Sequence, residues 1–499
     1  MPEQHFGLYQ KPIGQLALLE MFDLEVPPPF VTSFIGAHRR SDVQQHSITE
    51  HYPPRFEIGN EPIKHLCFAL KHEAFDLRVI VAALEAIGRV ELENWIRHEP
   101  TGAYSRRAWF LFEHFTKQQL DVPPAKRGGY VTLLNEERFY VGSPRKSTRH
   151  RVVDNLLGTA ALCPMVRRTE RLDTMVQYGW DDEARQITTQ YDATTLARAV
   201  HYLYTKETRS TYDIEREKPT SDKMERFVRA LQEASKFNPS SKADFVALQN
   251  LIVDARYRET DWRVEQNWVG ETLLNYEERV HFVCPKPEDV APLMEGWMRL
   301  TARLLEPKTQ VDPVIAAAVC AFAFVFIHPF EDGNGRIHRF IVHHVIAKRE
   351  FTPPGVVFPV SASILRDPRA YDDALETFSS AIMPFIRWTI TADQRMTVHN
   401  ETGFLYRYFD ATPLAEFLYD RVADTILNDL RQELEYLTKY DRMLEAIENV
   451  VDLPSRRRSL FVRLCAQNGG KLSKNKRAEF AELTDAEIQR LEAAVQAVM

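Results

Sequence analysis

The sequence predicts a mainly α-helical protein with a small β-hairpin. Two observations carry this prediction: apolar residues recur at helical spacing over most of the 499-residue chain, and strand-like alternation is confined to short stretches. The composition, 44% hydrophobic and 27% charged, is that of a globular protein long enough for several domains. We expect a mostly helical N-terminal domain of unknown role (1–190), a helical core (195–400) and a C-terminal helical region (401–499).

The bulk charge and the cysteines restrict the class of protein. A net charge of -7 argues against a surface built throughout for nucleic acid or anionic membrane. The five cysteines include no Cys-x-x-Cys pair, which is typical of a reducing compartment, and the first residues show no secretory signal. The apolar run at residues 314–327 is shorter than the roughly 20 residues that cross a bilayer. We therefore expect a cytoplasmic protein with no membrane partner.

In the N-terminal region, proline clusters separate two helical stretches. Apolar residues at helical spacing predict helices over residues 75–95 and 103–120. After Gly129, the sequence YVTLLNEERFYVG has two β-favouring runs around Asn135 and Glu136, which predicts a β-hairpin.

In the core, helical patterning starts near residue 195 and continues to about residue 387, with one polar interruption. There Trp268, Phe282 and Val283 flank a charged tip. We therefore expect a hairpin-like excursion over residues 262–283.

The C-terminal region starts near Thr412 and Pro413, an N-cap and first-turn pair, and apolar residues then mark one long amphipathic helix to Leu437. Short helices follow, the last of them opened by a capping box of Thr484 and Glu487. Residues 454–499 hold nine Lys or Arg against five Asp or Glu. This basic, helix-turn-helix-like tail makes DNA an alternative partner.

The residues that point to chemistry are concentrated in one turn, HPFEDGNGRIHR at positions 328–339. Gly333 and Gly335 permit backbone conformations that other residues disfavour, and Asn334 tolerates them better than most. A Gly-Asn-Gly turn that leads into a helix exposes backbone N–H groups at the helix N-terminus. The sequence therefore predicts an anion-binding turn.

Four side chains around this turn suit a metal-bound polyphosphate. Arg336 and Arg339 are three residues apart, so both project from one helical face toward phosphate oxygens. Asp332 is a hard oxygen ligand suited to Mg²⁺. His328, which ends the buried run, suits a general base that takes a proton from a hydroxyl. The simpler alternative is a glycine-capped helix with surface arginines.

The turn resembles the motif of the Fic (Fic/Doc) family, H-x-F-x-[D/E]-G-N-G-R-x-x-R, at every specified position. The matching residues are His328, Phe330, Asp332, Gly333, Asn334, Gly335, Arg336 and Arg339. The resemblance covers roughly residues 195–400. It implies a Fic-type helical core and a nucleotidyltransferase: a protein adenylyltransferase that moves AMP from ATP, with Mg²⁺, onto a Ser, Thr or Tyr hydroxyl of a target protein.

The resemblance also implies a role for each of these residues. His328 resembles the catalytic base, and Asp332 resembles the Mg²⁺ ligand. The Gly333–Gly335 turn resembles the anion hole for the α-phosphate, while Arg336 and Arg339 resemble the contacts to the β- and γ-phosphates.

Two further regions lie where Fic proteins have functional elements. The hairpin-like excursion is similar in position to the family's flap, which clamps an extended target segment by strand pairing. We expect Leu273, Leu274 and Tyr276 to bind the target there, and an ordinary surface hairpin is the alternative. Tyr371 lies where the family places nucleoside contacts, so it is expected either to stack on adenine or to pack.

Residues 195–218 are a candidate inhibitory helix. Many Fic proteins carry the inhibitory pattern [S/T]-x-x-x-E-[G/N]; Thr211 and Glu215 match it, whereas Arg216 stands at the last position. The resemblance implies that Glu215 pairs with Arg339 in place of the γ-phosphate and inhibits the enzyme. A charged, solvated helix is the alternative.

Two other functions stay open. The same site could run in reverse as a de-AMPylase, which removes AMP from a modified hydroxyl, with Glu215 positioning water. The chain could also be a DNA-binding regulatory protein with a Fic domain. Neither the target, which could be the chain itself, nor the oligomeric state follows from any pattern in the sequence.

Overall fold

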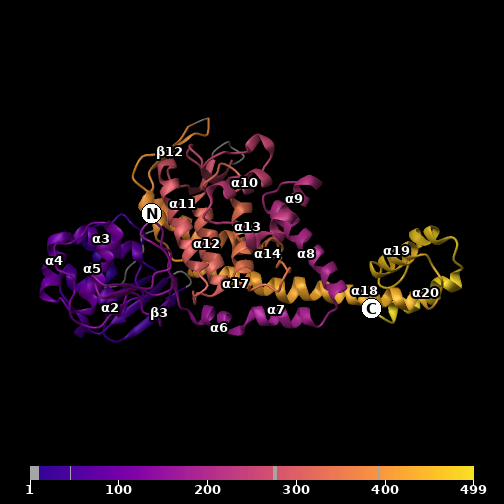
Figure 1. Cartoon of the computed structure of the whole chain (residues 1–499), viewed down its shortest axis with the longest axis horizontal. Coiled ribbons are helices and arrows are strands. Elements are labelled where there is room, and N and C mark those ends of the chain that lie inside the picture. The colour runs from indigo at the N-terminus through magenta and orange to yellow at the C-terminus, as the bar shows by residue number, and fades with distance from the viewer. Residues whose placement is uncertain (1–10, 45–46, 273–277, 392) are drawn as a thin grey trace. The chain divides into compact units, whose positions relative to one another are not determined.

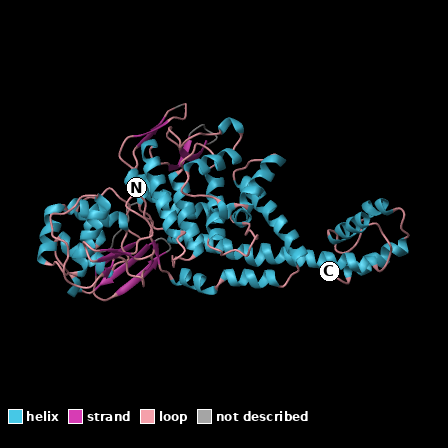
Figure 2. Cartoon of the chain, viewed as in Figure 1, coloured by secondary structure: helices cyan, strands magenta, loops and turns pink. Residues whose placement is uncertain are grey.

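The computed structural model describes residues 11–44, 47–272, 278–391 and 393–499. Helices make up most of the described chain, and its strands form small sheets (Figure 2). The expected mainly α fold class is confirmed. Within these residues, every helix is too short or too polar to cross a bilayer.

Two compact units make up the chain. The larger consists of Met1–Gly179, Thr208–Phe351 and Ser361–Arg421. The smaller consists of Trp180–Glu207, Thr352–Val360 and Val422–Met499. The larger unit thus holds the N-terminal residues together with most of the helical core, and the division into three domains stays a prediction.

The N-terminal part of the larger unit combines a four-stranded sheet with helices. The strand order is β1-β2-β4-β3, in which β2 and β4 are parallel and the other neighbours are antiparallel. The strands are β1 (Lys11–Ile13), β2 (Val31–Ile35), β3 (Arg40–Gln44) and β4 (Ser47–Tyr52). The helices are α1 (Gln15–Met21), α2 (Pro62–His72), α3 (Leu77–Ile87), α4 (Arg89–His98) and α5 (Ala103–Thr116). Leu66, Leu84 and Trp109 are fully buried members of the apolar core that the helices share.

The helices expected in this part are present, with one correction. Residues 75–95 form two helices, α3 and α4, because Gly88 between them adopts a φ of 80°, a left-handed conformation that ends a helix. Asp76 caps α3, since its Oδ1 accepts a hydrogen bond from the backbone N–H of Arg78 at 2.8 Å. The second expected helix is α5, which ends at Thr116 and is followed by Lys117 in a left-handed conformation.

The prediction of a β-hairpin after Gly129 is wrong. Its two runs, β5 and β6, pair with β8 and β9 and so belong to different sheets. Asn155 explains the difference, because its Oδ1 accepts from Leu134 N at 2.9 Å and its Nδ2 donates to Leu134 O at 3.1 Å. Asn155, about twenty residues later in the chain, thus forms the hydrogen bonds with the N–H and C=O of Leu134 that a hairpin partner would otherwise form. The strands of this segment are β5 (Val131–Thr132), β6 (Phe139–Tyr140), β7 (Arg145–Ser147), β8 (Val152–Asp154) and β9 (Val166–Arg167).

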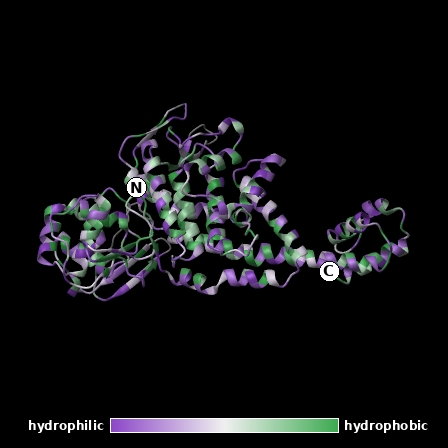
Figure 3. Ribbon diagram, viewed as in Figure 1, coloured by the Kyte–Doolittle hydropathy of each residue, from purple (hydrophilic) through white to green (hydrophobic). Residues whose placement is uncertain are grey.

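The apolar run of the sequence forms α12 (Pro313–Ile327), which lies inside the helical core (Figure 1) and is coloured hydrophobic along its length (Figure 3). It packs against α11 (Pro287–Leu304) and α13 (Asn334–Lys348). The indole N–H of Trp297 on α11 donates to the carbonyl of Cys320 on α12 at 2.7 Å. Residues 328–333 connect α12 to α13, so the packing of these two helices fixes both ends of the motif turn.

The hairpin-like excursion before α11 is confirmed. β10 (Trp268–Thr272) and β11 (Glu278–Val283) are antiparallel, with a register shift between Val269 and Gly270. Leu273, Leu274 and Tyr276 lie outside the described residues. The other elements of this region are α6 (Glu170–Tyr178), α9 (Ser221–Gln232), α10 (Lys242–Ile252), α14 (Val360–Arg366), α15 (Pro368–Ile382), β12 (Trp388–Ile390), β13 (Met396–Val398) and α16 (Gly403–Arg407).

The long C-terminal helix begins at Thr412 as expected and contains a π-helical turn at Thr425–Leu430. α19 and α20 pack on its second half, and the capping box of Thr484 and Glu487 is confirmed. Arginines of the tail pair with its own acids, as Arg477 does with Asp485 at 2.8 Å. The helices not yet given are α7 (Trp180–Thr189), α8 (Ala193–Ile214), α17 (Thr412–Asp424), α18 (Arg431–Glu448), α19 (Ser455–Ala466) and α20 (Asp485–Gln496).

Candidate active site

The imidazole of His328 is held rigidly at the end of α12. The residue adopts a left-handed conformation with φ of 51°, and its backbone N–H donates to Phe324 O at 3.0 Å. Its ring Nδ1 lies 3.2 Å from Val325 O. Because a carbonyl can only accept, we assign the hydrogen to Nδ1, which leaves the lone pair on Nε2.

His328 is neutral near pH 7. Burial and, to a smaller extent, the charge of Arg263 lower the pKa of its imidazole to about 4, although Val325 O, Glu215 and Asp332 act in the opposite direction. An uncharged imidazole with a free Nε2 lone pair is the form that accepts a proton.

Arg263 connects the motif turn to neighbouring backbone segments, and no sequence pattern pointed to it. Its guanidinium donates to three backbone carbonyls: Nε to His328 O at 2.7 Å, Nη1 to Glu265 O at 2.8 Å and Nη2 to Pro285 O at 2.5 Å. The side chain is buried. Arg263 therefore ties the base of the β10–β11 hairpin to the residue that carries the candidate base.

The turn itself is shaped by Asn334 and Gly333. The Asn334 Oδ1 accepts from Phe330 N at 3.0 Å, and its Nδ2 donates to Phe330 O at 2.7 Å. Gly333 has a φ of 91°, which a side chain would strain. Phe330 is fully buried against Trp262, with ring centroids 5.1 Å apart. The amide of Asn334 thus closes the turn, and the backbone of the turn is left to face a ligand.

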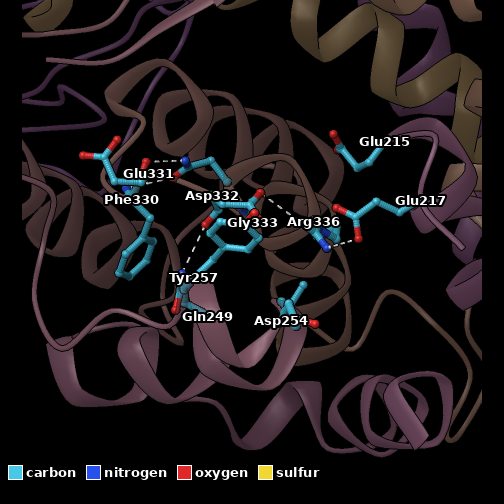
Figure 4. Close-up of polar contacts among 12 residues, drawn as sticks. Glu215, Glu217, Gln249, Asp254, Tyr257, Phe330, Glu331, Asp332, Gly333 and Arg336 are labelled. Atoms are coloured by element: carbon cyan, nitrogen blue, oxygen red, sulfur yellow. Dashed lines mark hydrogen bonds and ion pairs between the residues drawn. The ribbon is translucent and has the colours of Figure 1, made fainter. Parts of the chain in front are cut away.

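Gln249 and Glu259, which sequence reasoning also missed, hold the outer side of the turn. The Gln249 Nε2 donates to Glu259 Oε1 at 3.1 Å and lies 3.4 Å from Asp332 O (Figure 4), while Glu259 Oε1 accepts from Glu331 N at 2.9 Å. Burial raises the pKa of Glu259 to about 7. These contacts come from residues far from the motif in sequence.

Arg336 lies between two carboxylates. Figure 4 shows its guanidinium facing Asp332 on one side and Glu217 on the other. Nη2 donates to Asp332 Oδ1 and Nη1 to Glu217 Oε2, each at 2.9 Å. The Arg336 side chain is only 2% exposed. Glu217, just beyond α8, is a residue that the sequence pattern did not single out.

Arg339 is bound by the two residues of the candidate inhibitory pattern. Its Nε donates to Thr211 Oγ1 at 2.6 Å, and its Nη2 donates to Glu215 Oε1 at 2.6 Å and to Thr211 O at 3.0 Å. Burial raises the pKa of Glu215, but the charge and hydrogen bond of Arg339 outweigh that effect, so the pKa lies below its ordinary value. The pairing implied by the resemblance is therefore present as an ionised contact.

Glu215 also lies against the first turn of α13. A Cβ placed on Gly335 would be 2.4 Å from the Glu215 Oε1 atom. The first N–H groups of a helix have no partner within the helix and favour a negative charge. Glu215 thus places a carboxylate where the sequence predicts that an anion binds.

Arg216 departs from the inhibitory pattern at a strained position. Its φ of 56° is left-handed, a conformation that glycine and asparagine adopt more easily. The preference of the pattern for Gly or Asn thus has a physical reason at this position. In this chain Arg216 adopts the conformation at a cost of about 1 kcal/mol, and the turn brings Glu217 onto Arg336.

Tyr371 is buried behind α13. Its hydroxyl lies 3.2 Å from His338 Nδ1, and the two rings are nearly parallel with centroids 6.1 Å apart. These are the contacts of a packed residue, and stacking on adenine stays a prediction.

Asp332 fits a Mg²⁺ ion that is held mainly by phosphate oxygens. Its carboxylate is 43% exposed. In the described part of the chain, no group of three or more His, Cys, Asp or Glu is placed to hold a metal ion by itself. One carboxylate combined with phosphate oxygens and water is a usual donor set for Mg²⁺ beside a nucleotide.

Comparison with known proteins finds a family model that matches part of the core. Residues 239–346 match the model of the Fic/DOC family. The protein adenylyltransferase Fic of Culex quinquefasciatus is 27% identical over 159 residues, which are 31% of this chain and 29% of that protein. The protein of the same name from Nematostella vectensis is 29% identical over 117 residues, 23% of this chain and 25% of that one. The chain thus spans less than a third of the length of these relatives.

Solved structures of Fic proteins are similar at a lower level. A Fic family protein from Desulfovibrio desulfuricans aligns over 62% of this chain and 88% of its own, with 18% identity and a TM-score of 0.39. A Fic domain containing signaling protein from Bacteroides thetaiotaomicron aligns over 54% of this chain and 97% of its own, with 15% identity and a TM-score of 0.36.

Replacing Arg263 by Gln is expected to raise the pKa of His328 from about 4 toward, but not to, its ordinary value. The change removes a positive charge that disfavours the imidazolium, while burial, the larger cause, remains. A ¹⁵N NMR titration of the His328 ring measures the shift. Arg258→Gln, an exposed arginine five positions earlier, is the control and should leave the titration unchanged. An unchanged pKa in Arg263→Gln would show that the guanidinium does not tune the base.

Proposed function

We propose that this chain, whose residues 239–346 match the Fic/DOC family model, is a Fic family protein and a protein adenylyltransferase that transfers AMP from ATP to a Ser, Thr or Tyr hydroxyl of a target protein. One observation carries the proposal: Arg336 and Arg339 are buried beside a glycine turn and an uncharged imidazole. The relatives named protein adenylyltransferase Fic support it.

The residues of the turn suit the chemistry of nucleotidyl transfer. The Nε2 atom of His328 accepts the proton of the target hydroxyl, whose oxygen bonds to the α-phosphorus of ATP. The bond from the α-phosphorus to the oxygen that bridges it to the β-phosphate breaks, and pyrophosphate leaves with that electron pair. The backbone of the Gly333–Gly335 turn and the two arginines stabilise the negative charge. Mg²⁺ on Asp332 would supply charge neutralisation for the leaving group.

Target binding is assigned to the β10–β11 hairpin. An extended segment that adds to a hairpin edge gains backbone hydrogen bonds and is fixed beside the candidate base. Leu273, Leu274 and Tyr276 are proposed to contact this segment. The anchoring of the hairpin base by Arg263, which also bonds His328 O, supports a link between target binding and the position of the base.

Glu215 and Glu217, here called the acid pair, are proposed to inhibit the enzyme. They bind the two arginines through contacts of 2.6 and 2.9 Å, and Glu215 also lies over Gly335. A triphosphate that needs the same guanidinium donors must displace both carboxylates. The sequence predicted inhibition by Glu215 alone, and we propose that the contact between Glu217 and Arg336 adds to it in this chain.

The reverse reaction is the second candidate. Glu215 lies near enough to His328 to influence its titration, so it is also placed to orient a water molecule against a modified hydroxyl. DNA binding by the tail stays a prediction; the pairing of Arg477 with Asp485 and of Arg458 with Glu448 neutralises part of the charge on which it depends. A cytoplasmic location agrees with five unpaired cysteines.

The transfer reaction is tested by incubating ATP labelled on the α-phosphate with cell lysate and the purified chain. Glu215→Ala is expected to label protein bands, and Glu215→Ala combined with His328→Ala is expected to label none, because the base is lost. Release of AMP from an AMP-modified protein by the wild type, and not by Glu215→Ala, would favour the reverse reaction. Equal labelling by both variants would reject His328 as the base.

The acid pair is tested by labelling rates of single and double variants. Each carboxylate is about a third exposed, 34% for Glu215 and 38% for Glu217, so we discount the charge-assisted bond to about 1–2 kcal/mol. Glu215→Ala should therefore raise labelling by roughly fivefold to thirtyfold at subsaturating ATP. Glu217→Ala should raise it by a smaller factor, and the double variant should exceed both.

Asp213→Ala provides the matched control, since Asp213 is an exposed acid at the end of α8, two residues before Glu215. It should leave the labelling rate unchanged. If Glu217→Ala also had no effect in the Glu215→Ala background, the second contact would have no inhibitory role.

A further inference from the structure

A cavity of about 280 Å³ lies in the N-terminal part of the larger unit, away from the motif turn in sequence. It is lined by residues from the C-terminal end of α2, the start of α5 and the segment 132–139, and Figure 1 shows these two helices in the indigo part of the chain. Its exposed lining is mainly polar, and Leu70, Phe75, Leu133 and Phe139 contribute a smaller apolar part. None of the functions above uses it.

Three cations line this cavity, which we call the N-terminal cavity: Lys71, Arg107 and Arg138. Over the ranges that the structure describes, none of the three has a carboxylate within ion-pair distance. Elsewhere in the same unit most arginines are paired, as Arg149 is with Glu113 at 2.9 Å. A group of cations without carboxylate partners around a half-open pocket is a feature that an anion would complete.

The two acids of the lining do not neutralise these cations. Glu73 is buried and its Oε2 accepts from Gln15 N at 2.9 Å. Burial raises the pKa of Glu73 to about 8, against the hydrogen bonds of Ser33 and Gln15 and the charge of Arg138, which favour the carboxylate; even with both acids ionised, three cations face two anions. Glu136 is exposed to solvent. The lining therefore keeps a positive charge.

Arg107 has hydrogen-bonding capacity that the protein does not use. Its Nη1 makes one long bond, 3.4 Å, to Leu70 O, and its Nε is buried without a partner. Arg138 differs, because its Nη1 donates to Glu73 O at 3.0 Å and thus caps the carbonyl end of α2. Capping explains Arg138, but it leaves the buried Nε of Arg107 unexplained. Burial and the nearby charge of Arg138 lower the pKa of Arg107, as expected for a cation without a counter-ion.

We propose that the N-terminal cavity binds a small organic anion, with its phosphate or carboxylate group on Arg107 and Lys71 and its body against Phe75 and Tyr104. The volume admits a ligand of about the size of a substituted ring, at the low end of small-molecule sites. A planar guanidinium with free donors suits the paired oxygens of either group. This proposal is independent of the adenylyltransferase activity.

The test is calorimetric titration of the full chain with phenyl phosphate, benzoate and inorganic phosphate. We expect one of the two aromatic anions to bind, and whether it is phenyl phosphate or benzoate shows whether the site takes a phosphate or a carboxylate. Inorganic phosphate should bind more weakly, because it makes no contact with the apolar part of the lining. Arg107→Gln should weaken binding at least tenfold, and Lys71→Gln, at an exposed position, by a smaller factor. Glu136→Gln should strengthen binding, since it removes the exposed negative charge of the lining.

Two controls separate this cavity from the motif turn and from misfolding. Arg339→Gln should leave the binding unchanged; a loss there, with Arg107→Gln unaffected, would assign the anion to the motif turn and overturn the proposal. Lys71→Gln and Glu136→Gln act at exposed side chains, so their opposite effects test the site even if Arg107→Gln fails to fold. Absence of binding by all three probes would also overturn it.

Discussion

Two arginine side chains held almost entirely out of water, Arg336 and Arg339, set the constraint on which the site depends. A guanidinium cannot lose its proton at physiological pH, so each buried arginine requires anionic or carbonyl partners. In this chain the partners are Asp332 and Glu217 for Arg336, and Glu215 with Thr211 for Arg339. The site is therefore stable without a ligand only while the segment after α8 supplies carboxylates.

The rigidity of the turn follows from the helices on either side. α12 is uniformly apolar and must be buried, and α13 packs against it, so the residues between them have little freedom. The side chains of Asn334 and Arg263 form hydrogen bonds with backbone groups of the turn, Asn334 with Phe330 and Arg263 with His328 O. What remains directed outward is the Nε2 of His328, the carboxylate of Asp332 and the N-terminal end of α13. Preorganised donors of this kind are what stabilisation of developing charge requires.

Much of the fold and the centre of the site could be predicted from local sequence. Helical periodicity predicted the helices, and the spacing of glycines, histidine and arginines predicted a single turn in which these residues lie together. The residues that were missed, Arg263, Gln249, Glu259 and Glu217, reach the turn from other segments, and no local pattern marks such contacts. The hairpin error after Gly129 has the same origin, because Asn155 pairs with Leu134 from a different strand. Local patterns determine elements, while tertiary contacts decide which of their polar groups are already satisfied.

The proposed inhibition is a competition between the acid pair and a triphosphate for the same guanidinium donors. Calorimetric affinity for a non-hydrolysable ATP analogue with Mg²⁺, measured for the wild type and for Glu215→Ala combined with Glu217→Ala, tests it most directly. If the carboxylates compete with the triphosphate, the double variant binds the analogue at least tenfold more tightly. Equal affinity in the two proteins would contradict it.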